Sequence, residues 1–268
     1  GVLSITLLST VLTQLDKFIL SRMLSLSDFG YYAFASAVAS VLFRIAIPVF
    51  NIYFPRFSQA VGNNQQGLFT DSYHQACQLM ALILVPAGLT LAYFSHTIIL
   101  LWSSNPELAD HVFLLVTVLS IGNMLNGLLY MPYAAQLANN ITWIALRQNL
   151  VAIFLFVPAV YWSTSQWGVL GAAWCWVGLN LGYLVISIPI MHRFILRKRL
   201  WRWYTRDVAM PIVLGATLLG IIYGSSREIS DSLASLAIVG ISFLLSIALI
   251  GCVYWSLLDG RSKSDGTT

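Results

Sequence analysis

Long runs of apolar residues, separated by short polar segments, fill almost the whole chain. Each run is about 16–25 residues long, and about 20 residues of helix cross the hydrocarbon core of a bilayer. Eight spans are predicted, at residues 2–24, 30–51, 77–101, 111–131, 141–162, 168–191, 207–224 and 233–257. The pattern therefore predicts an all-α protein, a polytopic transmembrane helical bundle of about eight spans.

The segments between these spans are rich in turn-forming residues, as at 25–28, 103–106 and 163–166. The longest linker is expected at about 52–76, with a turn at 62–64 and few charged or titratable groups. A membrane enzyme such as an oligosaccharide polymerase needs a loop that presents acids, bases or nucleophiles. Because no linker offers such a set, we do not expect an enzyme.

The composition supports a membrane protein, since 58% of the residues are hydrophobic and only 9% are charged. Soluble domains carry about 25% charged residues. The net charge of +4 comes largely from one segment, which holds Arg193, Arg197, Lys198, Arg199, Arg202 and Arg206 without an acid. Such a segment is typical of a cytoplasmic loop that contacts membrane lipids, and it does not indicate nucleic-acid binding.

The basic segment also divides the chain. We expect a six-helix bundle at 1–195, a basic cytoplasmic loop at 196–206, two additional transmembrane helices at 207–258 and a polar cytoplasmic tail at 259–268. Counting spans outward from this loop places both termini of the chain in the cytoplasm. The chain begins directly inside an apolar helix, which is the pattern of a chain cut from something longer.

Charged residues inside two predicted spans are candidates for a binding site, because a charge at membrane depth needs a partner or a wet cavity. Asp16 and Lys17 lie in the first span, and Thr13 lies on the same helical face as Lys17. Hydroxyl groups that lead to an ammonium group are typical of a polar interior. We therefore expect Asp16 and Lys17 to line a cavity, together with Thr13.

Arg44 lies in the second span and follows Ser40 at helical spacing. Three interpretations stay open: a buried ion pair with Asp16, contact with an anion in a cavity, or extension of the side chain to the interface. Its guanidinium group suits a phosphate or carboxylate, because it donates two parallel hydrogen bonds. The predicted anion contacts are thus Arg44, Lys17 and Asp16, with Ser40 in the cavity lining.

Asn123 and Asn126 are three residues apart on one helical face, and they are further candidates for the cavity lining. Hydrogen bonds between helices are the alternative explanation for such residues. The histidines lie near span ends, where they are expected at the membrane interface, and the three cysteines stand singly in apolar runs. Their spacing indicates no metal site, and no cofactor is expected.

Several short motifs resemble one family. They are Gln-Leu-Asp-Lys-Phe-Ile-Leu at 14–20, Ser-Asp-Phe-Gly-Tyr-Tyr-Ala at 27–33, Phe-Pro-Arg-Phe-Ser at 54–58 and Gly-Val-Leu-Gly-Ala-Ala at 168–173. Across roughly residues 1–195 the chain resembles the polysaccharide biosynthesis flippases, which export lipid-linked oligosaccharides such as O-antigen units. These flippases belong to the multidrug/oligosaccharidyl-lipid/polysaccharide transporter superfamily.

The resemblance implies two six-helix lobes that face each other across a central cavity, with this chain as the carboxy-terminal lobe plus two helices. It implies a bacterial cytoplasmic membrane protein and an undecaprenyl-pyrophosphate-linked oligosaccharide as the substrate, whose pyrophosphate Lys17 and Arg44 would meet. It also implies a missing amino-terminal lobe or a second subunit as the partner.

Two alternatives remain. A cation-coupled drug exporter of the same superfamily would favour acids at membrane depth, and Asp16 is the only one that the sequence indicates. A non-transporting membrane scaffold of a polysaccharide assembly complex is the other alternative. The sequence does not indicate which glycan or which coupling ion is involved.

Overall fold

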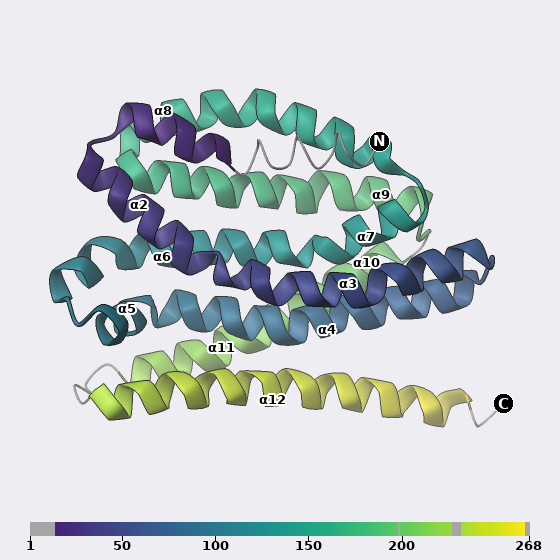
Figure 1. Cartoon of the computed structure of the whole chain (residues 1–268). Helices are drawn as coiled ribbons and strands as arrows, with labels where there is room; N and C mark the ends of the chain where they lie inside the picture. The colour runs from purple at the N-terminus through teal and green to yellow at the C-terminus, as the bar shows by residue number, and fades with distance from the viewer. Residues whose placement is uncertain (1–13, 198, 227–231, 266–268) are drawn as a thin grey trace.

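The computed structural model describes residues 14–197, 199–226 and 232–265, and within them it contains helices and no strands. Figure 1 shows the long helices lying side by side in one bundle. In chain order they are residues 14–23, α2 (Leu26–Ala39), α3 (Val41–Gly62), α4 (Gln66–Tyr93), α5 (Ser95–Ser103), α6 (Pro106–Leu128), α7 (Tyr130–Ala138), α8 (Thr142–Gly182), η1 (Tyr183–Ser187), α9 (Ile188–Phe194), α10 (Leu200–Arg202), η2 (Trp203–Ala209), α11 (Met210–Ser225) and α12 (Ser232–Asp265). The predicted all-α membrane bundle is confirmed.

Within the described residues, six helical stretches are long and apolar enough to cross a membrane. They are Leu26–Gly62, Gln66–Tyr93, Pro106–Ala138, Thr142–Phe194, Leu200–Ser225 and Leu233–Leu257. The stretch Thr142–Phe194 contains two predicted spans, 141–162 and 168–191. The predicted span 2–24 lies mostly outside the described residues.

A reversal at Gly168 separates the two spans inside α8. Gly168 has φ 59° and ψ −145°, a conformation that residues with a Cβ rarely adopt. The chain folds back here, and Figure 1 shows the two legs of α8 running beside each other. A Cβ at Gly171 would lie 2.3 Å from the carbonyl oxygen of Ser163. Glycine at both positions therefore allows the two legs to meet closely.

The linker predicted at 52–76 is wrong, because α3 continues to Gly62 and α4 begins at Gln66. Phe57, Phe69 and Tyr73 explain the extension. All three are fully buried, and the ring of Phe57 lies 5.6 Å from that of Phe69 and 6.3 Å from that of Tyr73, between ring centroids. The two helices thus pack on each other beyond their most apolar parts.

Two other helix boundaries differ from the prediction. The helix predicted at 77–101 breaks at Phe94, after which α5 runs separately. The helix predicted from 207 begins at Leu200, inside the basic segment. Trp203 accounts for this early start, because its side chain is fully buried against the bundle.

Two π-helical segments, η1 and η2, each lead into a proline. In η1 the N–H of Ile188 donates to the carbonyl of Tyr183, so the next bond in this i→i−5 register would join residue 189 to Leu184. Pro189 has no N–H, and the hydroxyl of Tyr204 donates to the Leu184 carbonyl instead, at 2.5 Å. In each segment the proline leaves one carbonyl for a side chain of another helix.

The same arrangement recurs in η2. The N–H of Met210 donates to Thr205, and Pro211 cannot donate to the carbonyl of Arg206. That carbonyl accepts the hydroxyl of Tyr254, from α12, at 3.4 Å. The two tyrosines therefore connect η1 to η2 and η2 to α12.

The connections between helices lie at two opposite ends of the bundle. Figure 1 shows the α3–α4 turn and the segment between α9 and α10 at one end. The start of α2, helix α5 and the reversal of α8 lie at the other. This alternation is what the predicted succession of spans requires.

Candidate functional site

A polar chamber of about 330 Å³ lies between the helix at 14–23, α2, α3, α6, the start of α7 and the second leg of α8. It is lined by Gln14, Asp16, Lys17, Ser36, Ser40, Phe43, Leu119, Asn123, Asn126, Tyr130 and Trp176. Asp16, Lys17, Ser40, Asn123 and Asn126, all named from the sequence, thus come together in one place. Thr13 lies outside the described residues.

Asp16 is held at the chamber by Tyr32. The hydroxyl of Tyr32, a fully buried residue of α2, donates to Oδ2 of Asp16 at 2.6 Å. The backbone N–H of Lys17 donates to Oδ1 at 2.7 Å. The carboxyl group therefore joins the first described helix to α2, and both of its oxygens have protein donors.

A chain of hydrogen bonds connects α6 to the second leg of α8. Asn126 Nδ2 donates to Asn180 Oδ1 at 2.7 Å, and Asn180 Nδ2 donates to the carbonyl of Trp176 at 2.8 Å. The indole N–H of Trp176 then donates to Asn123 Oδ1 at 2.8 Å. Both expectations for Asn123 and Asn126 therefore apply, because they bond between helices and also line the chamber.

Arg44 does not line the chamber. Its side chain is exposed on α3, one residue past Phe43, which does line it. The described residues contain two ion pairs within 4.0 Å, His74–Asp207 and His96–Asp110. The alternative of a buried pair between Arg44 and Asp16 is therefore wrong.

The chamber offers neutral hydrogen-bonding groups beside two opposite charges. The amide Nδ2 of Asn123 makes no hydrogen bond to another described residue, and Ser36 and Tyr130 line the same cavity. The ring of Trp176 adds an aromatic surface. Amides, hydroxyls and an aromatic ring suit a polyhydroxylated ligand, because such a ligand presents both donors and apolar faces.

Sequence reasoning missed Tyr130 and Trp176 as lining residues. Leu119, Asn123, Asn126 and Tyr130 recur at i, i+4, i+7 and i+11, so the face that the asparagines define could have indicated Tyr130. Trp176 carried no such signal, because it is one of several tryptophans in apolar runs.

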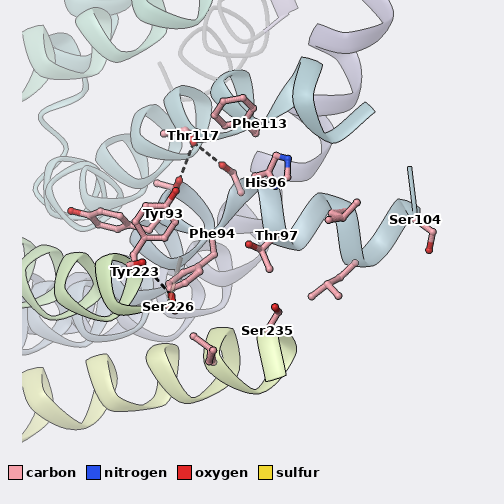
Figure 2. Close-up of a pocket in the computed structure, with 15 residues that line it drawn as sticks. Tyr93, Phe94, His96, Thr97, Ser104, Phe113, Thr117, Tyr223, Ser226 and Ser235 are labelled. Atoms are coloured by element: carbon pink, nitrogen blue, oxygen red, sulfur yellow. Dashed lines mark hydrogen bonds between the residues drawn. The ribbon is translucent and has the colours of Figure 1, made fainter. Parts of the chain in front are cut away.

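A larger cavity, of about 950 Å³, lies at the junction of α4, α5, α6, α11 and α12 (Figure 2). Most of its polar groups are already paired. Ser95 Oγ lies 2.9 Å from Thr117 Oγ1, which donates to the Ala92 carbonyl. The hydroxyl of Tyr93 donates to the carbonyl of Ala216. Because these bonds join helix to helix, we assign this cavity no ligand.

Two of the histidines expected at the membrane interface lie buried inside the bundle. His74 and His192 are 1% and 2% exposed. Nδ1 of His74 lies 2.5 Å from Oδ2 of Asp207, and Asp207 is a fully buried acid within a candidate spanning helix. This pair could not be predicted from the sequence, because its members are 133 residues apart.

Comparisons with known proteins agree with the resemblance drawn from the motifs. A family model described as "Polysaccharide biosynthesis protein" matches residues 1–106. A Shigella flexneri protein described as an O-antigen transporter is 25% identical over 174 residues, which is 63% of this chain and 40% of that protein. The lipopolysaccharide biosynthesis protein WzxC of Escherichia coli K12 is 23% identical over 234 residues, which is 83% of this chain and 44% of that protein.

The chain thus spans less than half the length of these curated relatives. No solved structure matches the chain closely. The similarity to the polysaccharide biosynthesis flippases is nevertheless confirmed, because the family model and both relatives point to it.

Proposed function

Given this similarity, we propose that the chain is part of a transporter that flips undecaprenyl-pyrophosphate-linked oligosaccharides across the bacterial cytoplasmic membrane. The observation that carries the proposal is the polar chamber, which lies inside a bundle of otherwise apolar membrane helices. The relatives are named for O-antigen transport and lipopolysaccharide biosynthesis, which favours this function over drug export and over an enzyme.

In this proposal the chamber contacts the sugars of the substrate. Asn123 and Ser36 offer hydrogen bonds and Trp176 offers an aromatic face. At about 330 Å³ the chamber lies at the small end of ligand pockets, which run from about 300 to 1,000 Å³. A facing amino-terminal lobe, or a second subunit, would therefore complete the cavity.

The anionic pyrophosphate is assigned to Lys17 and Arg44. Neither side chain takes part in an ion pair among the described residues. Lys17 lines the chamber. Arg44 is exposed and directly follows Phe43, which lines the chamber. Two separated cations can contact the pyrophosphate in inward- and outward-facing states in turn, and the difference in contacts would shift the balance between those states.

The test is the export of surface polysaccharide by the complete two-lobe protein that contains this sequence. Lys17→Ala and Arg44→Ala are expected to reduce export at least about tenfold, since a charge-assisted hydrogen bond is worth about 1.5–3 kcal/mol. Arg22→Ala is the matched control, because Arg22 is an exposed cation on the same helix as Lys17 and outside the chamber.

Export is compared at equal amounts of protein in the membrane. Impaired export in Lys17→Ala and Arg44→Ala, with normal export in Arg22→Ala, supports the anion contacts. Normal polysaccharide in both Lys17→Ala and Arg44→Ala would show that these two residues do not contact the pyrophosphate. Intact export with loss of assembly partners would favour the scaffold.

A further inference from the structure

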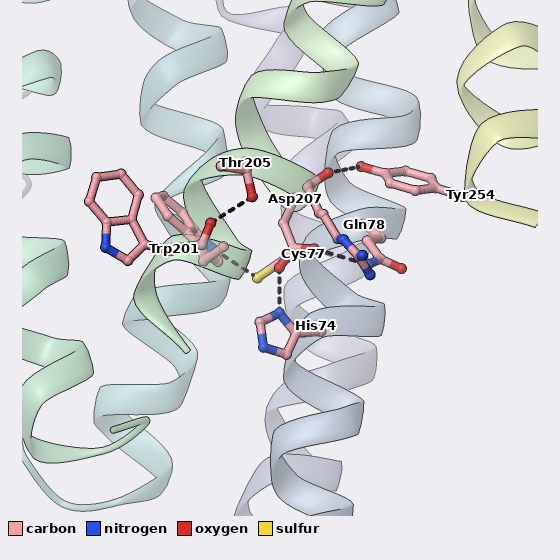
Figure 3. Close-up of polar contacts among 9 residues, drawn as sticks. His74, Cys77, Gln78, Trp201, Thr205, Asp207 and Tyr254 are labelled. Carbon is pink, nitrogen blue, oxygen red and sulfur yellow. Dashed lines mark hydrogen bonds and ion pairs between the residues drawn. The ribbon is translucent and has the colours of Figure 1, made fainter. Parts of the chain in front are cut away.

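A buried acid–base pair joins α4 to η2, far along the chain from the chamber residues of the first helix. Nδ1 of His74 lies 2.5 Å from Oδ2 of Asp207, and Nε2 of Gln78 donates to Oδ1 of Asp207 at 2.9 Å. Figure 3 shows these side chains pointing toward one another between the two helices. The side chains of His74 and Asp207 are 1% and 0% exposed, so water does not screen their charge.

His74 is the one basic group within ion-pairing distance of Asp207 among the residues that the structure describes. The titratable groups nearby are Tyr73 and Cys77 of α4, His192 of α9, Tyr204 of η2 and Tyr254 of α12. The cations of the same segment are Arg202, which is half-buried, and Arg206, which is exposed. The charge of Asp207 is therefore balanced chiefly by the proton that it shares with His74.

The number of protons on the pair decides its net charge. With one shared proton the pair is neutral as a whole, whichever group carries it. Without that proton a carboxylate remains buried against a neutral imidazole, and an uncompensated buried charge is strongly destabilising. The deprotonated state thus favours any movement that lets water reach Asp207.

We propose that His74 and Asp207 form a binding site for a single proton, and that release of this proton loosens the contact between α4 and η2. The hydrogen bonds of this contact are those of the pair, the one from Gln78, and the one that the indole N–H of Trp203 donates to Cys77 Sγ at 3.3 Å. The segment that would loosen leads directly into α11.

A second buried histidine, His192, lies near the pair. Nε2 of His192 and Nε2 of His74 are both buried without a hydrogen-bond partner. The ring of Tyr73 contacts both histidines, with its centroid 5.8 Å from that of His192 and 5.4 Å from that of His74. His192 also lines a cavity of about 520 Å³ with Arg193 and Arg197.

This site does not depend on the nature of the transported molecule, and its test needs no transport. The chain is labelled with ¹⁵N-histidine in lipid nanodiscs, and the nitrogen signals are followed by NMR from pH 5 to pH 9. The His74 signal is assigned with His74→Gln. Loss of the shared proton is expected to change the His74 signal, and Asp207→Asn is expected to move or abolish that change. His96, whose partner is Asp110, is the internal control, and its signals should be the same in both proteins.

Loosening is measured by hydrogen–deuterium exchange of the amides of residues 200–206. The wild-type chain is expected to exchange about tenfold faster than Asp207→Asn at pH 9, and at a similar rate at pH 6. Comparison at equal pH removes the intrinsic pH dependence of exchange. A His74 ring that keeps one protonation state throughout overturns the proton site, and this needs no folded variant. A rate ratio that does not vary with pH overturns the loosening.

Discussion

Two glycines in the second leg of α8 have very different surroundings, although both lie in the same apolar run. A Cβ at Gly171 would meet the backbone oxygen of Ser163 at 2.3 Å, whereas a Cβ at Gly178 would have nothing within 4 Å. A clash with a backbone atom cannot be relieved by a change of side-chain rotamer. Gly171 is therefore required by the reversal of α8, and Gly178 is not.

Gly171→Ala is expected to destabilise the protein by about 1–3 kcal/mol, because the added methyl group forces the two legs apart. Gly178→Ala is the matched control and should change stability by less than about 0.5 kcal/mol. Thermal unfolding of both variants in detergent measures the difference. Equal melting temperatures would mean that the legs do not approach as closely as the structure describes.

At this scale the sequence predicts polar residues well and aromatic ones poorly. Asn123 and Asn126 stand out because an amide in an apolar run needs a partner, and both have one. Trp174 and Trp176 do not differ in the sequence, yet the first is 56% exposed and the second 9%. An exposed tryptophan and one that lines the chamber lie in equally apolar sequence, so only the packing distinguishes them.

The two π-helical segments, η1 and η2, share one arrangement of hydrogen bonds. In each segment a proline removes the donor for one carbonyl, and a tyrosine of the next helix supplies the replacement. The acceptors are Leu184 and Arg206, and the donors are Tyr204 and Tyr254. A hydrogen bond missing within one helix is thus replaced by a hydrogen bond between two helices.

Tyr204→Phe should lower stability by about 1–2 kcal/mol, since the Leu184 carbonyl is left without a donor inside the bundle. Tyr254→Phe should have a smaller effect, because its bond to Arg206 is longer, at 3.4 Å. Tyr161→Phe is the control, because Tyr161 is 62% exposed. Detergent melting curves compare the three. If Tyr204→Phe melts like Tyr161→Phe, the tyrosine does not support η1.

The helical class could be predicted from the apolar runs, but several helix boundaries could not. The runs record where a helix is apolar, whereas α3 and α4 continue for further turns held by Phe57 and Tyr73. The early start of the helix at Leu200 likewise depends on burial of Trp203. Contacts between helices decide these ends, and a single sequence does not display them.

The molecule as a whole has two ends that differ in charge. The end with the α9–α10 connection carries the arginines of the basic segment, and the opposite end carries Asp28, Glu107 and Asp110 near the starts of α2 and α6. Positively charged segments are retained on the cytoplasmic side of a membrane. The first end is therefore the one that we expect in the cytoplasm.

Labelling in intact cells tests this orientation. Gln65→Cys places a thiol in the α3–α4 turn, at the basic end, and Glu107→Cys places one at the start of α6. A membrane-impermeant maleimide should label Glu107→Cys in intact cells and Gln65→Cys only after lysis. The wild-type chain, which has Cys77, Cys175 and Cys252, gives the background. The reverse pattern would invert the topology.

The order in which the two tyrosine bonds can form also has a consequence for synthesis. Leu184 precedes Tyr204 by 20 residues, and Arg206 precedes Tyr254 by 48. Each acceptor therefore leaves the ribosome before its donor exists, and an unsatisfied carbonyl in lipid costs several kcal/mol. The carbonyls of Leu184 and Arg206 must consequently be shielded from lipid until their donors have been made, the second of them in α12. We expect the insertion machinery to release the helices at the end of the chain as a group.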